Sequence, residues 1–380
     1  MPTTQVELPS KKWKTSSDSE VILEAFATWG EKFIHKLNGM FAIAIYDKIK
    51  DTIHLFRDRI GIKPLFYFHD KSQLVFASEI KAFKFSNLNL TLDKKSIYSF
   101  LHLGYIPKNH TIYNEIKKVK PGHIINFKNG VLSENNYWNT NNLLKKEINQ
   151  NFFDTKKQLN DLILKSVKKR LISDVPIGTF LSGGTDSSLV TAIAQKLNSK
   201  PVNSFSIGFK EAKYNESKHA KVVANFLQTN HTEFILSEKE ALSEIEEIMD
   251  HFDEPFADSS ALPTMLVSKM AKKHVTVCLS GDGGDELFLG YGAYSWARRL
   301  NKSIFWNFKK PISKILLASL NNQKKRAGLV FNSPKKNWKS HIFSQEQYLF
   351  SETEIEKLLN KNFNSQLIKN LNSNQKVFRK

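Results

Sequence analysis

Residues 180–188 read FLSGGTDSS, a run of small and hydroxyl residues that separates an apolar segment from a helical pattern. The apolar segment, 177–181, has the length of a short buried strand. After the run, apolar residues recur at the spacing of one buried helix face: Leu189, Ala192, Ile193 and Leu197. A strand, a glycine turn and a helix N-terminus therefore coincide. This pattern predicts a βα unit in the middle of the chain.

The glycine turn has the chemistry of a phosphate site. Glycines let the backbone approach a ligand, while free N–H groups and the helix dipole supply positive potential. The hydroxyl donors are Ser182, Thr185, Ser187 and Ser188. Asp186 adds a carboxylate that could hold a magnesium ion on the phosphates. The run is not a Walker A loop, because no G-K-[ST] ends it. The alternative is a serine-capped helix after a plain glycine turn.

Strand-like and helical segments alternate around this turn, which predicts an α/β fold with a doubly wound parallel sheet. Further strands are predicted at 202–209, 232–236 and 275–279. Helices are predicted at 153–171, 188–197, about 220–227, 238–252 and 263–273. Ligands of such sheets bind at the carboxyl ends of the strands.

The last predicted strand continues into a second motif, SGDGGDELF at 280–288. Three glycines bracket crowded carboxylates, and the motif lies on the same rim of the sheet as the first loop. An acidic turn or a weak calcium loop is the alternative, although the EF-hand spacing is absent.

With both loops identified, the chain resembles the glutamine-dependent asparagine synthetases. The matching stretches are WGEKFIHKLNGMFAIAIYD, RDRIGIKPLFY, ASEIKAF, SDVPIGTFLSGGTDSSLV, FSIGF, DEPFADSSALPT and SGDGGDELFLGY. The resemblance implies an N-type ATP pyrophosphatase domain preceded by an α+β sandwich of the N-terminal-nucleophile glutaminase type. It places a truncated glutaminase-like domain at 1–140, a linker at 141–152 and the ATP-pyrophosphatase domain, incomplete at its carboxyl end, at 153–380.

The resemblance also assigns site residues. It implies that ATP contacts Leu181, Ser182, Gly183, Gly184, Thr185, Asp186, Ser187, Ser188, Ile207, Ser280 and Gly281. Asp282 and Asp285 match catalytic acids, and Asp186 matches a magnesium ligand. Asp18 matches the aspartate that binds the amino group of glutamine. The residues by themselves leave other interpretations open, because Leu181 and Ile207 suit simple core packing and Asp18 suits an N-cap of a helix at 19–29.

The implied activity is ATP-dependent amidation of a carboxylate, L-aspartate giving L-asparagine, through an acyl-adenylate with release of AMP and pyrophosphate. ATP and Mg²⁺ are the implied cofactors. Position 282 is usually glutamate in asparagine synthetases, so Asp282 leaves another acceptor open, such as a surface-polysaccharide sugar acid. Two further alternatives are an RNA-modifying ATP pyrophosphatase and an inactive remnant that only binds nucleotide.

The ends of the chain depart from the family pattern. The second residue is Pro2, where the family has its cysteine nucleophile, so no glutaminase activity is expected from this chain. The single cysteine, Cys278, falls in an apolar strand and is expected to be core packing. The family's segments K-x-D-R-x-S-M and R-x-P-F-L-D are also not found before Lys380. The chain is therefore expected to be an internal piece of a longer enzyme.

Composition argues against disulfide-rich, membrane-spanning and nucleic-acid-binding proteins. One cysteine excludes a disulfide framework, and the longest apolar run near 40–46 is far shorter than the roughly 20 residues that span a bilayer. The net charge of +19 is concentrated in residues 301–380, which hold sixteen Lys and Arg against four Glu. Aromatic residues such as Trp338 lie among them, but the lysines are spread over helical patterns, so nucleic acid is not the expected partner. A cytoplasmic protein with small-molecule substrates is expected, and the resemblance allows a homodimer.

Overall fold

The computed structural model describes residues 8, 13–143, 151–210, 215, 217–292, 294–295, 303–321, 324–325, 327–328, 331, 349–350, 355 and 358–359. The chain divides into two compact units. Unit 1 comprises Met1–Ser99 and Ile106–Ile148, and unit 2 comprises Phe100–Tyr105 and Asn149–Lys380. Pro2, Trp338 and residues 144–150 of the predicted linker lie outside the described residues.

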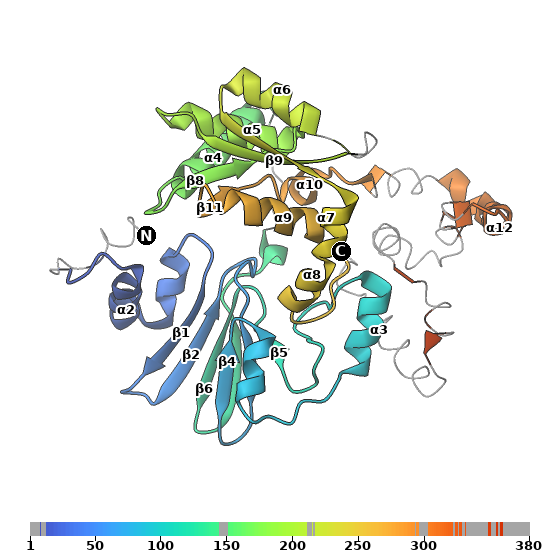
Figure 1. The fold of residues 1–380 in the computed structure, drawn as a ribbon. Coiled ribbons are helices and arrows are strands. Elements are labelled where there is room, and N and C mark those ends of the chain that lie inside the picture. Colours follow the sequence, from blue (N-terminus) through green and yellow to red (C-terminus); the bar gives the residue numbers. More distant parts are fainter. Residues whose placement is uncertain are drawn as a thin grey trace. The chain divides into compact units, whose positions relative to one another are not determined.

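Unit 1 contains two antiparallel sheets, with strand orders β1-β2-β6-β7 and β4-β3-β5 (Figure 1). The strands are β1 Ala42–Asp47, β2 Thr52–Arg57, β3 Phe66–His69, β4 Leu74–Ala77, β5 Lys117–Lys118, β6 His123–Lys128 and β7 Val131–Asn136. The helices are α2 Asp18–Trp29 and α3 Lys94–Leu103, whose residues from Phe100 on belong to unit 2, with 3₁₀ turns η1 Gly30–Lys36, η2 Ile80–Phe85 and η3 Thr140–Asn142.

Alternation along β2 explains the layers of unit 1. Phe56 packs with Val21 of α2 and Phe33 of η1, whereas Leu55 packs with Tyr67 of the second sheet. Successive residues of a strand face opposite sides of its sheet, so one strand can serve both cores. The result is an α+β sandwich, as predicted.

Unit 2 is built on a four-stranded parallel sheet with the order β10-β9-β8-β11. The strands are β8 Ile177–Phe180, β9 Asn203–Phe209, β10 Asn230–Leu236 and β11 Val277–Leu279. The helices are α4 Phe152–Arg170, α5 Thr185–Leu197, α6 Ser217–Leu227, α7 Glu238–Ser243, α8 Ile245–His251, α9 Ala261–Ala271, α10 Gly284–Phe288 and α12 Ser303–Leu317. Helices α5 and α6 cover one face and α9 the other (Figure 1), so the predicted doubly wound fold is confirmed.

Helix α6 begins about three residues earlier than predicted, and α9 lies two residues earlier, whereas two other differences have a local cause. Helix α5 begins at Thr185 rather than at residue 188, because Gly184 is its N-cap. The single helix predicted at 238–252 is two helices, α7 and α8, that meet at Glu244. There the backbone stays in the right-handed helical region but departs from ideal helical angles (φ −96°, ψ −2°), and Glu244 ends one helix and caps the next. Among the described residues, no helix is both long and apolar enough to cross a bilayer.

Candidate functional site

The site begins at two neighbouring strands of unit 2. Strand β8 is followed by residues 182–188, the phosphate loop, and β11 is followed by residues 280–286, the acidic loop. The chain order of the four strands is 3-2-1-4 across the sheet, so β8 and β11 flank the point where the order reverses. Ligands of open parallel sheets bind outside the carboxyl ends at this reversal.

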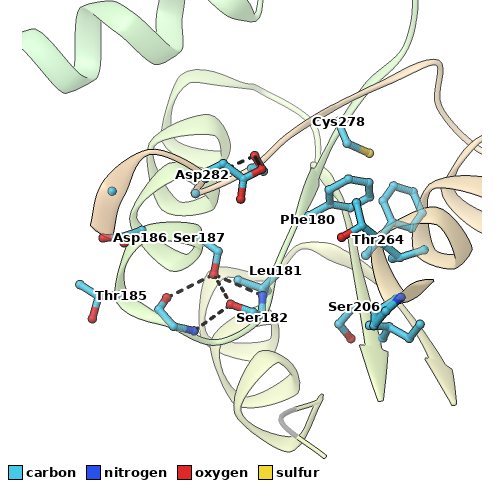
Figure 2. A pocket seen from close by; sticks show the side chains of 18 of the residues that line it. Phe180, Leu181, Ser182, Thr185, Asp186, Ser187, Ser206, Thr264, Cys278 and Asp282 are labelled. Atoms are coloured by element: carbon cyan, nitrogen blue, oxygen red, sulfur yellow. Dashed lines mark hydrogen bonds between the residues drawn. The ribbon is translucent and has the colours of Figure 1, made fainter. Parts of the chain in front are cut away.

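Hydrogen bonds to Ser187 hold the phosphate loop in shape. The Ser187 hydroxyl accepts from the backbone nitrogen of Ser182 at 3.2 Å, shares a bond with the Ser182 hydroxyl at 2.9 Å and donates to the Gly184 carbonyl at 3.3 Å. The Ser182 hydroxyl in turn accepts from the Gly184 nitrogen at 3.2 Å. Figure 2 shows these bonds closing a ring inside the loop. Ser182 and Ser187 therefore preorganise the loop.

The N-terminus of α5 is open to an anion. No side chain caps it, and the first helical hydrogen bond runs from the Ser188 nitrogen to the Gly184 carbonyl at 3.0 Å. The preceding N–H groups of a helix have no partner within it and lie at the positive end of its dipole. In the part of the chain that the structure describes, the buried Ser188 hydroxyl also has no hydrogen-bond partner.

Gly183 explains why the loop carries glycine at its second position. Its φ is +83°, in the left-handed region that other residues avoid. A Cβ there would also lie 2.6 Å from the backbone nitrogen of Ala220 on α6. The loop consequently packs directly on the start of α6, and no larger residue fits.

The acidic loop packs against the phosphate loop. A Cβ on Gly281 would lie 2.7 Å from the Ser187 nitrogen, and one on Gly284 would meet the Asp186 carboxylate. Within the acidic loop, the Ser280 hydroxyl donates to the Asp282 carboxylate at 2.8 Å. Gly283 has a φ of +92° and caps α10. The glycines thus allow two loops from separate strands to touch.

The two loops open onto one cavity of about 1190 Å³. Eleven residues that the sequence assigned to a site line it: Leu181, Ser182, Gly184, Thr185, Asp186, Ser187, Ile207, Ser280, Gly281, Asp282 and Asp285. Gly183 and Ser188 belong to the loop but do not line the cavity. Leu181 is 1% exposed and also packs with Ala220 and Ala224 of α6, so the core-packing interpretation of this residue holds as well.

An aromatic and polar wall, which was not predicted from the sequence, lies across the cavity from the phosphate loop. Phe180, Phe205, Ser206, Thr264 and Cys278 line the cavity. Figure 2 shows Phe180, Thr264 and Cys278 grouped on the side away from Thr185. Phe180 lies within SDVPIGTFLSGGTDSSLV, Phe205 and Ser206 begin FSIGF, and Thr264 ends DEPFADSSALPT, so membership of the matched stretches was the available signal.

Cys278 does not fit the expectation of plain core packing. It is half-buried, packs with the cluster around Phe205 and also lines the cavity. Burial raises the pKa of its thiol to about 11. At neutral pH the side chain is therefore a protonated, weakly reactive thiol.

Asp186 fits the chemistry of a magnesium ligand. Mg²⁺ is usually held by one or two carboxylates together with phosphate oxygens and waters. Asp186 offers such a carboxylate at the start of α5, on the cavity wall. Within the described ranges, no cluster of three or more His, Cys, Asp or Glu could hold a metal by itself. A metal here would need the ligand's own oxygens.

Asp18 belongs to a separate cavity of about 780 Å³ within unit 1. This cavity is lined by the start of α2, residues 42–45 of β1 and Lys63. Asp18 is exposed and is the first residue of α2, whereas Ser17 is the N-cap and accepts from the Ser19 nitrogen at 3.2 Å. The alternative interpretation of Asp18 as the N-cap is therefore wrong.

Loop 58–63 forms one edge of this cavity because Asp58 organises it. Asp58 is 1% exposed, and its carboxylate accepts backbone N–H groups of Phe41 and of residues 60–63, at 2.7 to 3.3 Å. Arg57 donates to the carbonyls of Gly61 and Lys63. The motif RDRIGIK is thus a self-bonded loop that places Lys63 at the cavity.

Comparison with known proteins gives two family matches. The family described as asparagine synthase matches residues 158–377, and the glutamine amidotransferase domain matches residues 3–138. The chain is 35% identical over 314 residues to asparagine synthetase (glutamine-hydrolyzing) 1 of Bacillus subtilis, covering 82% of this chain and 49% of that protein. It is 37% identical over 287 residues to putative asparagine synthetase (glutamine-hydrolyzing) 2 of Methanocaldococcus jannaschii, covering 73% and 54%.

The chain thus spans about half the length of the curated relatives it matches. Among solved structures, an NH3-dependent NAD synthetase from Campylobacter jejuni covers 60% of this chain and 96% of its own. Its sequence identity is 16% and its TM-score 0.26, which is too low to support an argument.

Proposed function

Because the chain belongs to the asparagine synthase family, we propose that it carries out the ATP-dependent amidation of a carboxylate. L-Aspartate, giving L-asparagine, is the acceptor that the family indicates. The observation that carries this proposal is the meeting of the phosphate loop and the acidic loop at one cavity, where Gly281 packs on Ser187.

ATP would bind with its phosphates on the phosphate loop. The N–H groups at the start of α5 and the hydroxyl of Thr185 are the donors for phosphate oxygens, while the Ser182 hydroxyl holds the loop through Ser187. The adenine would lie against the apolar wall, which includes Leu181 and Ile207. Asp186 would hold Mg²⁺, which when bound would offset the negative charge of the phosphates.

The acceptor carboxylate would then attack the α-phosphorus and release pyrophosphate. Donors fixed before the reaction stabilise charge that develops on the phosphates, an effect often worth about 3 kcal/mol per donor. Ammonia would next attack the acyl carbon, forming the C–N bond as the bond to AMP breaks. Asp282, aligned by the Ser280 hydroxyl, would accept the proton that the new amide loses, with Asp285 beside it on the cavity wall.

The acceptor is the part of the reaction that residue 282 influences. Aspartate there is one methylene shorter than the glutamate usual in asparagine synthetases, which leaves more room near the acyl group. A bulkier acid, such as a sugar carboxylate, is therefore the second candidate acceptor. In unit 1 we propose that Asp18 binds the amino group of glutamine, the source of ammonia in the longer relatives.

Pyrophosphate release tests the proposal. The purified chain would be given ATP, Mg²⁺, ammonium and a panel of carboxylates that includes L-aspartate. We expect release that depends on one carboxylate and is lost in Asp186→Ala. The matched control is Asp161→Ala, which removes an exposed aspartate of α4 and should leave release unchanged.

The acceptor that supports release identifies the substrate. A folded chain that binds ATP but releases no pyrophosphate with any carboxylate would contradict amidation and favour the nucleotide-binding remnant. A folded chain that binds no ATP would contradict the nucleotide site itself.

A further inference from the structure

A histidine joins two serines behind the cavity of unit 2. His231 of β10 lies opposite Ser204 of β9 in the parallel register. Its Nδ1 is 2.8 Å from the Ser204 hydroxyl, and its Nε2 is 3.1 Å from the hydroxyl of Ser206. The imidazole thus spans two successive residues on the same side of β9, and both of its nitrogens are engaged.

The surroundings make this arrangement specific. Ser204 is fully buried and Ser206 is 3% exposed. The Ser204 hydroxyl also bonds the Thr229 hydroxyl at 2.8 Å, beside the end of α6. Buried polar groups need partners, and a network in which each is paired holds its members in fixed positions.

The ring gives the two serines opposite hydrogen-bonding roles. A neutral imidazole has one donor and one acceptor nitrogen, so the two hydroxyls must take opposite roles toward it. Burial lowers the pKa of His231, an effect to which Lys221 adds and which Glu233 opposes. The neutral ring is therefore the form present near pH 7, and in either tautomer the role of the Ser206 hydroxyl toward the ring is opposite to that of Ser204.

Only one of the two serines reaches the site. Ser206 lines the cavity together with its chain neighbours Phe205 and Ile207. Ser204 does not line the cavity. Figure 2 shows Ser206 on the wall below Thr264. Anything that moves the Ser206 side chain therefore changes the surface that a ligand meets.

We infer that His231 is a positioning residue of the nucleotide site, which holds Ser206 at the cavity wall and fixes the hydrogen-bonding role that its hydroxyl offers to a purine nucleotide. The inference rests on the proposed function, because it takes the ligand of this cavity to be ATP. His231 itself does not line the cavity, and it lies outside the matched sequence motifs.

Two substitutions of His231 separate its bond to Ser206 from its bond to Ser204. The amide of glutamine can replace Nε2, which faces Ser206, whereas the shorter asparagine can replace only Nδ1, which faces Ser204. We expect His231→Asn to weaken ATP binding and raise the KM for ATP about three- to tenfold, the loss of one net hydrogen bond. The kcat should change less than about twofold, because the interaction is made equally in ground and transition states.

His231→Gln should restore ATP affinity to within about twofold of the unchanged chain, since it keeps the bond to Ser206. Ser206→Ala should match His231→Asn, and the double variant should be no worse than either one, because both remove the same interaction. The matched control is the pair His251→Asn and His251→Gln, at an exposed histidine of α8 that does not line the cavity. ATP and GTP dissociation constants would be measured for each variant by calorimetry, together with its thermal unfolding midpoint.

Two failures are distinguishable. If the unchanged, folded chain binds no ATP, the proposed function fails. If it binds ATP but His231→Asn binds equally well, or if Asn and Gln weaken binding alike, the positioning role of His231 is overturned while the nucleotide site stands. Equal losses for ATP and GTP support a hold on the cavity wall that is independent of the base. A larger loss for ATP supports a direct contact between Ser206 and adenine.

Discussion

The backbone of Gly281 lies so close to Ser187 that a Cβ at position 281 would be 2.7 Å from the Ser187 nitrogen. These two residues follow different strands, β11 and β8, and are 94 positions apart in the chain. Their contact joins the acidic loop to the phosphate loop. Because both partners at this contact are backbone atoms, neither can move away as a flexible side chain would.

Gly281→Ala should therefore weaken ATP binding about 10- to 100-fold, since displacement of a binding loop by a few tenths of an ångström misplaces several donors together. Calorimetric titration with ATP and Mg²⁺ measures the change. The matched control is Gly283→Ala in the same loop, where a Cβ meets nothing within 4 Å but φ is +92°. The control should cost about 1–2 kcal/mol of unfolding free energy through backbone strain and leave binding near that of the unchanged chain. Equal binding by the two variants would disprove the interlocked loops.

Ser187→Ala should lower the free energy of unfolding by about 1–3 kcal/mol, because it leaves the Ser182 nitrogen without its partner. Ser188→Ala is the neighbouring control. Its hydroxyl is buried and has no partner among the described residues, so without nucleotide its removal should be neutral or slightly stabilising. Denaturant titration of both variants without ATP measures the difference. A cost for Ser188→Ala equal to that for Ser187→Ala would contradict the hydrogen-bond assignment.

Cys278 should react slowly with thiol reagents and still more slowly when ATP is bound. Its raised pKa, about 11, makes the thiolate about 100-fold scarcer at pH 8 than for a thiol two pKa units lower. Because the chain has one cysteine, a single labelling rate reports this site alone. The rate in denaturant should return to that of a free cysteine. Labelling that ATP does not slow would show that the nucleotide lies elsewhere.

Stability should fall as the pH drops below about 6.5, the ordinary histidine pKa. Burial lowers the pKa of His69, His102, His110 and His231 in the folded chain. The folded state then binds fewer protons than the unfolded state, so this stability is fully present above pH 6.5 and is lost as the pH falls through the lowered values.

His231→Gln cannot titrate, and its unfolding midpoint should therefore approach that of the unchanged chain as the pH falls from 7.5 to 5.5. Thermal unfolding across this range, at constant ionic strength, is the measurement. A gap between the two proteins that is constant or widens with acid would show that His231 does not bind a proton more weakly in the folded state.

Much of unit 2 could be predicted because its information is local. Periodicity places β8 and α5, and the glycines of the phosphate loop mark the turn between them. The chain does not show locally that Gly183 must fit under α6 or that α7 and α8 are separate helices. Those facts depend on packing against residues far along the chain and on backbone geometry at one position.

The sequence by itself determined the two loop chemistries, the parallel doubly wound class and most residues of one cavity wall. Only the tertiary structure decided that β11 pairs with the free edge of β8, which places Asp282 and Asp186 on the wall of one cavity. It also decided that His231 reaches Ser206 and that Phe205 and Cys278 form the opposite wall. The reason is physical: side-chain periodicity records which face of an element is buried, whereas strand order and cross-strand contacts arise from pairing between distant segments.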